Sequence, residues 1–397
     1  MSTVSAALPL RADTGPRSAN ARGPHVPLAA VREALARERP RCTLYALSDS
    51  DHTLQIYAGF YALHCAGSIR LRQSHSRDEL MRKLAPVPLE GKRLSKALYN
   101  LFVDMEGVGL VFFDIRDSAG YYPELVDRIA LYAKRSFRGP DYVAAPAKFI
   151  PFGLNCSVYT DRACFAELVN SVRQVDGSAL SVKHLLVSLA RMLPGAGAML
   201  GMPTVSLLSA PPDPALPPKA IFFARTWQPS EPDDVGFEAL NEMRARCIRA
   251  LREAFGPMFL GGFSRTQHAC RLYPDCVAGP ELSTRRRDYL RRLRAYPVCV
   301  ATTGLHGSIG WKFAEYVALS KAIVSEPLEF ELPGRVAAGE NYLEFATPEG
   351  CVAAVARLFT DDALRARMMA RNQEYYLEHG TPDALVARVL HAALAAA

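Results

Sequence analysis

Residues 296–332 read YPVCVATTGLHGSIGWKFAEYVALSKAIVSEPLEFEL, and this stretch decides the fold. The apolar run at 298–301 predicts a buried strand, the glycines after it predict a loop, and the pattern at 311–319 predicts a helix. A second apolar run, at 322–325, predicts another strand directly after the helix. Two parallel strands joined by a helix form a βαβ unit. Its loop is therefore expected at the carboxyl edge of a sheet, where open α/β sheets bind their ligands.

Glycines recur at three-residue spacing in this loop, as Gly304, Gly307 and Gly310. Glycine lets backbone N–H groups approach an anion closely, and the start of a helix adds roughly half a positive charge. The loop from Gly307 through Ser308 to Gly310 is therefore predicted to bind a phosphate group.

Two charged residues of the predicted helix, Lys312 and Glu315, lie three apart and so share one face near its start. Lysine can neutralise a phosphate. A carboxylate beside a phosphate is unfavourable unless it accepts from a neutral group, such as the diol of a ribose. The spacing indicates a nucleoside diphosphate, and the alternative is a solvent-exposed helical ion pair. Trp311 is expected to pack in the core rather than to stack on a ligand.

The stretch GSIGWKFAEYVALSKAIVSEPLE at 307–329 resembles the donor-site signature of bacterial group 1 glycosyltransferases with the GT-B fold. Residues 340–342 and 369–379 are also similar to this family, so the resemblance covers most of the C-terminal half. It implies an α/β architecture of two facing doubly wound (Rossmann-like) domains. Many retaining members carry a glutamate eight residues before the helical one. That position is Gly307 here, so a retaining outcome is not implied.

Length and composition indicate an ordinary globular protein. The chain has 397 residues, enough for two domains, with 49% hydrophobic and 22% charged residues. Its net charge is +7, with arginines clustered at 285–294. Without a nucleic-acid-binding motif, such clusters favour a solvated helix or peripheral contact with an anionic membrane surface. Nine cysteines without a CxxC pair favour reduced thiols, a cytoplasmic location and no zinc site.

Composition also predicts the domain organisation. Residues 1–26 are rich in Ala, Ser, Pro and Arg, which predicts a disordered leader. Five prolines at 211–218 predict a linker. We expect an acceptor-side α/β domain at 27–210 and a domain that binds the nucleotide sugar at 219–380. The resemblance implies that a terminal helix, 381–397, packs back towards the first domain.

Polar residues follow two predicted strands of the N-terminal half, 42–47 and 109–113. Because the carboxyl ends of such strands face the ligand cleft, these residues are candidates for the base that deprotonates an acceptor if transfer inverts the anomeric centre. They are Asp49, Asp51, His52 and Asp114. For the first of them, a helix-capping role is an equal alternative.

Other segments of this half are expected to frame the cleft. Residues 124–137 are expected to form a helix that leads to a strand at 148–151, and Asn155 is expected to complete the following turn rather than to bind a sugar. Helices are expected at 163–172 and 181–192. The small, apolar segment 194–208 either packs near the cleft or contacts a membrane.

In the C-terminal half, the strand AIFFA at 220–224 is followed by Arg225. Arg225 resembles the phosphate-binding arginine of the family, and a guanidinium suits a diphosphate. Arg265, after a strand at 258–262, either reaches the donor phosphate or faces solvent. His306, in the glycine loop, either donates to the phosphate or the sugar or stabilises the loop.

The resemblance implies glycosyl transfer from a nucleotide-diphosphate sugar to a glycan or lipid-linked acceptor, in cell-surface polysaccharide or lipopolysaccharide biosynthesis. Lys312, Arg225 and the loop N–H groups would stabilise the leaving diphosphate. Since protein cations do this, no tightly bound metal or other cofactor is expected, nor a nucleic-acid partner. The alternatives are a nucleotide-sugar epimerase of similar fold, which converts its donor without an acceptor, and a catalytically silent nucleotide-sugar-binding protein.

Overall fold

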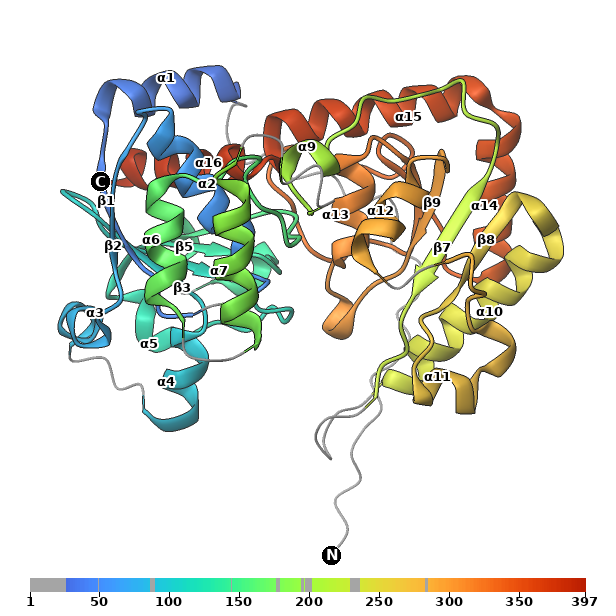
Figure 1. Ribbon diagram of the computed structural model, residues 1–397, viewed down its shortest axis with the longest axis horizontal. Helices are drawn as coiled ribbons and strands as arrows, with labels where there is room; N and C mark the ends of the chain where they lie inside the picture. The colour runs from blue at the N-terminus through green and yellow to red at the C-terminus, as the bar shows by residue number, and fades with distance from the viewer. Residues whose placement is uncertain are drawn as a thin grey trace, which may run out of the picture.

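A computed structural model shows two α/β domains side by side along the long axis of the molecule (Figure 1). It describes residues 26–48, 50–85, 90–143, 145–175, 179–193, 196, 202–228, 236–282 and 285–397. The predicted leader, apart from Val26, lies outside these residues, as do Asp49 and most of the segment 194–201.

The first domain contains a six-stranded sheet with the order β2-β1-β3-β4-β5-β6. Its strands are β1 (Arg41–Tyr45), β2 (Arg70–Ser74), β3 (Leu101–Met105), β4 (Gly109–Asp114), β5 (Ile129–Lys134) and β6 (Phe149–Pro151). The central strand β3 runs antiparallel to both neighbours, and the other pairs are parallel. The other five strands therefore end at one edge of the sheet.

The expected helix at 124–137 is wrong. A four-residue helix, α5 (Pro123–Val126), is followed directly by strand β5, which pairs with β4 and β6. Five of the six residues of β5 are buried, which is typical of an interior strand covered on both faces. Lys134 and Arg135, which the predicted helix would have carried, are buried and paired beside this strand.

Helices cover both faces of this sheet, and two more stand at its side. They are α1 (Leu28–Glu38), α2 (Leu54–Cys65), α3 (Arg77–Leu84), α4 (Gly91–Leu98), α6 (Phe165–Arg173) and α7 (Ala179–Arg191). The terminal helix α16 (Pro382–Ala396) joins α1 and α2 in one core cluster of this domain. A Cβ on Gly59 of α2 would lie 2.2 Å from the carbonyl oxygen of Pro382, so glycine permits this close approach.

The second domain contains a five-stranded, fully parallel sheet with the order β11-β10-β9-β7-β8. Its strands are β7 (Ala220–Ala224), β8 (Phe259–Phe263), β9 (Val298–Ala301), β10 (Ala322–Ser325) and β11 (Tyr342–Glu344). The predicted βαβ unit is confirmed as β9, α13 (Trp311–Ala318) and β10. The chain first adds β8 on one side of β7 and then β9 on the other. The carboxyl ends of β7 and β9 therefore form the topological switch point where such sheets bind ligands.

The remaining helices complete the layers of the second domain. They are α9 (Val205–Leu208), α10 (Phe237–Phe255), α11 (Gln267–Leu272), α12 (Arg286–Leu293), α14 (Pro348–Thr360) and α15 (Asp362–Tyr375). Residues of α12 and α13 belong to the core on one face of the sheet, and those of α10 and α14 to the core on the other. In the part of the chain that the structure describes, no helix combines the length and apolar character needed to cross a bilayer.

The two sheets face each other through their carboxyl edges. After β5, Arg135 donates to the carbonyl oxygen of Ile309 in the glycine loop at 3.0 Å, and Phe137 forms a backbone bridge with Glu331. After β1, the His52 ring lies 4.7 Å from the Trp311 ring. The expected architecture of two facing α/β domains is confirmed, with one antiparallel strand in the first sheet that the doubly wound pattern did not predict.

Candidate functional site

The glycine loop after β9 is a compact turn that folds on itself. The N–H of Gly304 donates to the carbonyl oxygen of Ser308 at 2.7 Å, and the N–H of Ser308 donates to that of Leu305 at 3.0 Å. Packing explains one glycine, because a Cβ on Gly304 would lie 2.6 Å from the Ser308 hydroxyl. Gly310 is the N-cap of α13. The loop therefore delivers the chain to a helix start at the switch point, as predicted.

Gly307 has a different reason to be glycine. Its φ is +71°, and a Cβ there would lie 2.7 Å from a carboxylate oxygen of Glu329. A side chain at this position would thus be strained by the left-handed backbone, and the Glu329 side chain would have to move aside. The preceding His306 also has a left-handed backbone, with φ 57°, and its side chain is exposed. Its proposed contact with a donor stays a prediction.

Arg244, which the sequence did not single out, holds the switch point together from α10. Its guanidinium donates to the Thr302 hydroxyl at 2.9 Å, to the Thr303 carbonyl at 2.8 Å and to the Arg225 carbonyl at 2.9 Å. Burial lowers the pKa of Arg244 to about 10, against the opposing effect of Glu326. This one side chain therefore fixes the end of β7 relative to the end of β9.

The sequence feature that could have identified Arg244 is its position on the apolar stripe of α10. Phe237, Asn241, Arg244 and Ile248 recur at helical spacing and are all buried. Asn241 acts on the same edge, since it accepts from the Trp227 N–H at 2.9 Å and donates to the Trp227 carbonyl at 2.8 Å. Polar residues on a core-facing stripe need partners, and here the partners are the loops of the site.

Arg225 lies at the end of β7 with its guanidinium 3.7 Å from the centre of the Trp227 ring. Burial lowers its pKa, and the negative charge of Asp117 opposes this shift. Arg225 is exposed, so a ligand can reach it. Arg265 is also exposed but follows β8, which is one strand farther from the glycine loop than β7.

Lys312 and Glu315 form part of a charged cluster rather than an exposed helical pair. Glu315 is only 2% exposed. Its carboxylate lies 3.1 Å from a guanidinium nitrogen of Arg286 and 3.4 Å from the Lys312 ammonium. Burial lowers the pKa of Lys312, and the neighbouring Glu315 opposes this shift; the ammonium lies 3.3 Å from the centre of the Tyr289 ring. The solvent-exposed alternative is therefore wrong, while ribose binding by Glu315 stays a prediction.

Trp311 is half-buried and packs against the core of the second domain, as expected. Its ring also contacts His52 from the first domain edge-on, with an angle of 63° between the planes. It thus forms part of the contact between the domains.

His52 stands opposite the glycine loop. Its backbone carbonyl accepts from the Asn155 amide at 3.0 Å, so Asn155 positions the loop that follows β1. Burial, followed by the positive charge of Arg135, lowers the pKa of His52 below its usual value of 6.5. Its Nδ1 is buried and has no hydrogen-bond partner within the described part of the chain. The lowered pKa favours the neutral form of this imidazole at neutral pH.

Asp51, its neighbour, is partly exposed and has two partners. The Ser157 hydroxyl donates to it at 3.4 Å, and the Nε2 of His184 from α7 lies 3.6 Å away. The neighbouring His184 is the main cause that lowers the pKa of Asp51. The other candidate of this loop, Asp49, lies outside the described residues.

Asp114 is not a cleft residue, which corrects the expectation that it is a candidate base. It is fully buried and accepts from Arg116 and from the Tyr132 hydroxyl at 2.6 Å each, with the Lys134 ammonium at 3.3 Å. Burial alone would raise its pKa, but Lys134 and Arg116 outweigh burial and lower it. With its oxygens engaged by these donors, Asp114 stabilises the sheet.

The carboxylate that does reach the cleft is Asp117, three residues later. It pairs with Arg135, and its side chain is 35% exposed. Arg135 is itself buried and also donates to the carbonyl of Ile115 at 3.3 Å. The pair therefore lies beside the glycine loop, which Arg135 contacts through Ile309.

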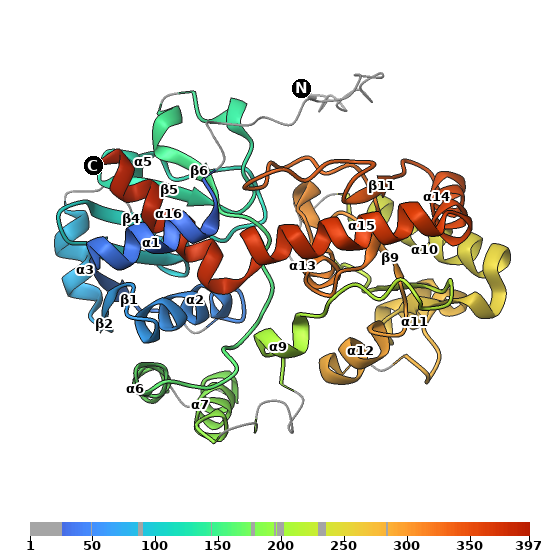
Figure 2. The same ribbon diagram turned by 90° about the horizontal axis from the view of Figure 1, so that it is seen from above.

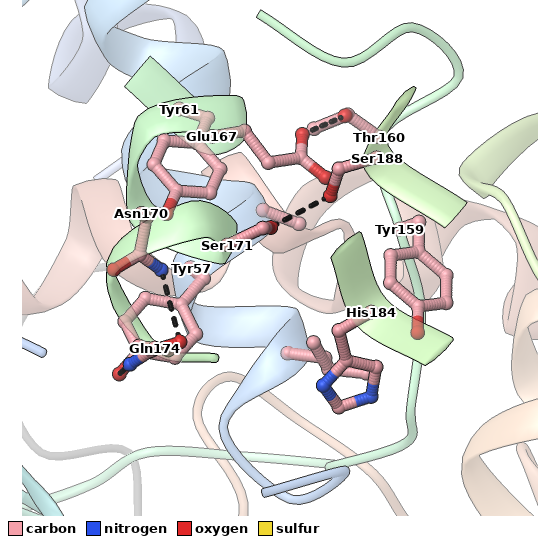
Figure 3. A pocket seen from close by; sticks show the side chains of 12 residues that line it. Tyr57, Tyr61, Tyr159, Thr160, Glu167, Asn170, Ser171, Gln174, His184 and Ser188 are labelled. Atoms are coloured by element: carbon pink, nitrogen blue, oxygen red, sulfur yellow. Dashed lines mark hydrogen bonds between the residues drawn. The ribbon is translucent and has the colours of Figure 1, made fainter. Parts of the chain in front are cut away.

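A small cavity of about 20 Å³, enough for a single water, lies between α2, α6 and α7 (Figure 3). Its wall includes Tyr57, Tyr61, Glu167 and Asn170, and also His184, which contacts Asp51. The cavity thus adjoins the acceptor side of the cleft. Among the described residues, no three His, Cys, Asp or Glu side chains gather as a metal site would require.

No family model and no curated protein matches the chain. Among solved structures, it is similar to an α1,3-fucosyltransferase at 9% identity, covering 91% of each chain with a TM-score of 0.43. It is similar to Anabaena HepE in complex with UDP at 12% identity, covering 87% of this chain and 94% of that one with a TM-score of 0.38. A putative UDP-N-acetylglucosamine 2-epimerase from Listeria monocytogenes is similar at 12% identity, covering 91% and 75% with a TM-score of 0.36.

These likenesses are distant, so the fold is judged from the chain's own topology. Two α/β domains face each other through the carboxyl edges of their sheets, the second sheet is fully parallel with its switch point at that edge, and the last helix returns to the first domain. The chain therefore has the expected α/β architecture of two facing domains with a returning C-terminal helix.

Proposed function

We propose that the protein transfers a sugar from a nucleotide-diphosphate sugar to a glycan or lipid-linked acceptor, as in the synthesis of cell-surface polysaccharide or lipopolysaccharide. One observation carries the proposal. The glycine loop opens at the switch point of the second sheet, between Arg225 on one side and the start of α13 on the other, and faces the carboxyl edge of the first sheet. A pyrophosphate bound there would meet an arginine and a helix start.

The chemistry that this arrangement supports is stabilisation of a leaving diphosphate. Negative charge grows on the phosphate as the sugar–oxygen bond breaks, and groups already fixed in place stabilise that charge at little reorganisation cost. Arg225 is held by stacking on Trp227, and the loop is held by Arg244. Lys312 adds a second cation from the first turn of α13. As part of the proposal, these groups act without a tightly bound metal.

His52 is the proposed base for the acceptor hydroxyl. Its lowered pKa keeps the imidazole neutral near pH 7, the form that can take a proton. Asp51 and Asp117 are weaker candidates because each is engaged with a partner, His184 and Arg135 respectively. Direct attack by the acceptor with His52 as base inverts the anomeric centre.

The experiment that tests the function offers the purified protein a panel of nucleotide-diphosphate sugars with and without glycan or lipid-linked acceptors. Release of nucleoside diphosphate that depends on an acceptor supports a transferase. Isomerisation of the sugar without an acceptor identifies an epimerase, and a bound donor that is never turned over identifies a binding protein. Either of the last two results rejects the proposal.

The proposed setting is the cytoplasmic side of an anionic membrane. All nine cysteines are free in the structure, which suits a reducing compartment. Exposed arginines of α12, Arg287 and Arg291, could attract anionic lipid headgroups. Arg286 of the same cluster has another role, because it pairs with Glu315.

A further inference from the structure

Helix α7 buries its polar face and exposes its apolar face, which is the reverse of the usual arrangement in a globular domain. The side chains at helical spacing that it buries are polar, namely His184, Ser188 and Arg191. The side chains that it exposes are apolar, namely Val182, Leu186 and Leu189, with Leu193 just beyond its end. A surface helix normally turns its apolar stripe to the core and its polar face to water.

Helix α6, which packs beside α7, shows the same inversion. It buries Glu167, Asn170 and Ser171, whereas Phe165 at its start is 74% exposed and Val172 is 55% exposed. The α6–α7 hairpin (residues 165–193) is therefore inverted as a unit.

The buried polar groups hold the hairpin in this orientation. Arg191 forms a buried ion pair with Glu167, and the Ser171 and Ser188 hydroxyls lie 2.8 Å apart, as Figure 3 shows in part. Rotating either helix to bury its exposed apolar side chains would leave these polar groups without partners, at a cost that the apolar gain would have to exceed. The outward apolar face is thus a fixed feature of the fold.

This face is the main exposed apolar surface of the described residues. Seven of the thirteen exposed large hydrophobic side chains belong to it, namely Phe165, Val172, Val175, Val182, Leu186, Leu189 and Leu193. Figure 2 shows α6 and α7 at the periphery of the first domain, with no other element beyond them. Apolar groups gathered in this way mark an interaction surface.

The charges beside this face indicate what covers it. Arg162, Arg173 and Lys183 are exposed around it. In the described part of 161–193, the one exposed acid is Asp161, which accepts from the Ser206 N–H at 2.9 Å. Apolar side chains flanked by cations match the interface of an anionic bilayer, where the former enter the acyl boundary and the latter lie among the headgroups.

We propose that the α6–α7 hairpin docks the protein on the surface of an anionic membrane. Docking by itself does not depend on the transferase activity. The inference that docking favours a lipid-anchored acceptor does rest on the proposed function. Since His184 on the inner face of α7 lies 3.6 Å from Asp51, docking through the outer face brings the acceptor side of the cleft close to the bilayer. An acceptor with a lipid anchor could then reach His52 without leaving the membrane.

The test is co-sedimentation of the full chain with vesicles of phosphatidylglycerol and phosphatidylcholine, compared with vesicles of phosphatidylcholine alone. We expect binding to the mixed vesicles that weakens as salt is added. Leu186→Ser combined with Leu189→Ser should weaken it more than about tenfold, because both leucines lose their acyl contact. Both are surface residues, so the variant should keep its unfolding temperature.

A matched control is Leu272→Ser combined with Leu377→Ser. These leucines are 51% and 52% exposed and lie in α11 and in the turn 376–380, away from the hairpin. The control should bind vesicles like the unaltered chain. Equal binding by both double variants overturns the proposal. A second result would also overturn it. If the unaltered chain does not bind vesicles but self-associates in sedimentation velocity, and the hairpin variant does not self-associate, the face binds a second copy of the chain.

A second variant covers the case in which the serine variant fails to fold. Leu186→Trp keeps the apolar character of the face, and its fluorescence should shift to shorter wavelength when anionic vesicles are added, whereas Leu272→Trp should show no shift. The absence of a shift in Leu186→Trp overturns docking. Vesicle binding without any sugar transfer would leave docking intact and reject only the proposed function.

Discussion

The guanidinium of Arg244 donates to the carbonyl oxygen of Arg225 at 2.9 Å and so joins the middle of α10 to the end of β7. The same guanidinium reaches the Thr302 hydroxyl and the Thr303 carbonyl after β9. One buried side chain therefore sets the distance between the proposed phosphate arginine and the glycine loop.

Replacing this residue, as Arg244→Met, should destabilise the protein by about 2–4 kcal/mol, because two carbonyl oxygens and one hydroxyl lose their donor in a buried place. Urea unfolding measures the change. Arg246→Met is the matched control, since Arg246 lies on the exposed side of the same helix and should cost less than about 0.5 kcal/mol. Equal costs for the two variants would contradict the role given to Arg244.

Lys312→Met should weaken the binding of nucleoside diphosphates by about tenfold to a hundredfold, because a charge-assisted hydrogen bond to phosphate is lost. Thermal shift with a nucleoside diphosphate measures this, since a bound ligand raises the apparent stability. Lys96→Met makes the same change of charge on exposed α4 and should leave the shift unaltered. An unaltered shift in Lys312→Met would remove this lysine from the proposed donor site.

Acceptor-dependent transfer should fall as the pH drops through the pKa of His52, because a protonated imidazole cannot take a proton. Burial and Arg135 lower that pKa below 6.5, so the fall should occur below pH 6.5. In His52→Gln the rate of transfer should drop by about a hundredfold or more, and the decrease at low pH should disappear from the plot of kcat/KM against pH. His391→Gln, far along the chain in α16, should keep both the rate and the fall.

The same shift predicts a small effect of pH on stability. His52 binds a proton less readily in the folded chain than in the unfolded chain, so the unfolded state takes up more protons between the folded pKa and 6.5. Stability should therefore decrease as the pH falls through this window. His52→Gln should remove that part of the decrease in urea unfolding measured at several pH values.

Asp114→Asn should destabilise the protein by about 3–5 kcal/mol, because it leaves Lys134 and Arg116 without their buried carboxylate. Asp117→Asn should cost about 1 kcal/mol or less, since Asp117 is partly exposed and pairs at the rim of the cleft. Unfolding by urea compares the two. A stable but inactive Asp114→Asn variant would return Asp114 to the candidate bases.

The sequence by itself determined the βαβ unit at 296–332, because strand, glycine loop and helix are written in neighbouring residues whose periodicity and backbone freedom are local properties. It also placed Arg225, Gly310 and Lys312 correctly at the edge where β7, the loop and α13 meet. The prediction of a helix at 124–137 was wrong because local pattern does not show which distant residues neutralise buried charges. The charged residues of this segment are neutralised by Asp114 and Asp117, which belong to the loop after another strand.

Only the tertiary structure decided which charges face the cleft. Asp114 and Asp117 are three residues apart, yet the first is fully buried and the second is partly exposed, because burial depends on which distant segments pack over each side chain. The pairing of Glu315 with Arg286, the hold of Arg244 on two strand ends and the inverted hairpin 165–193 have the same origin. Each is set by contacts between parts of the chain far apart in sequence, and periodicity carries no information about such contacts.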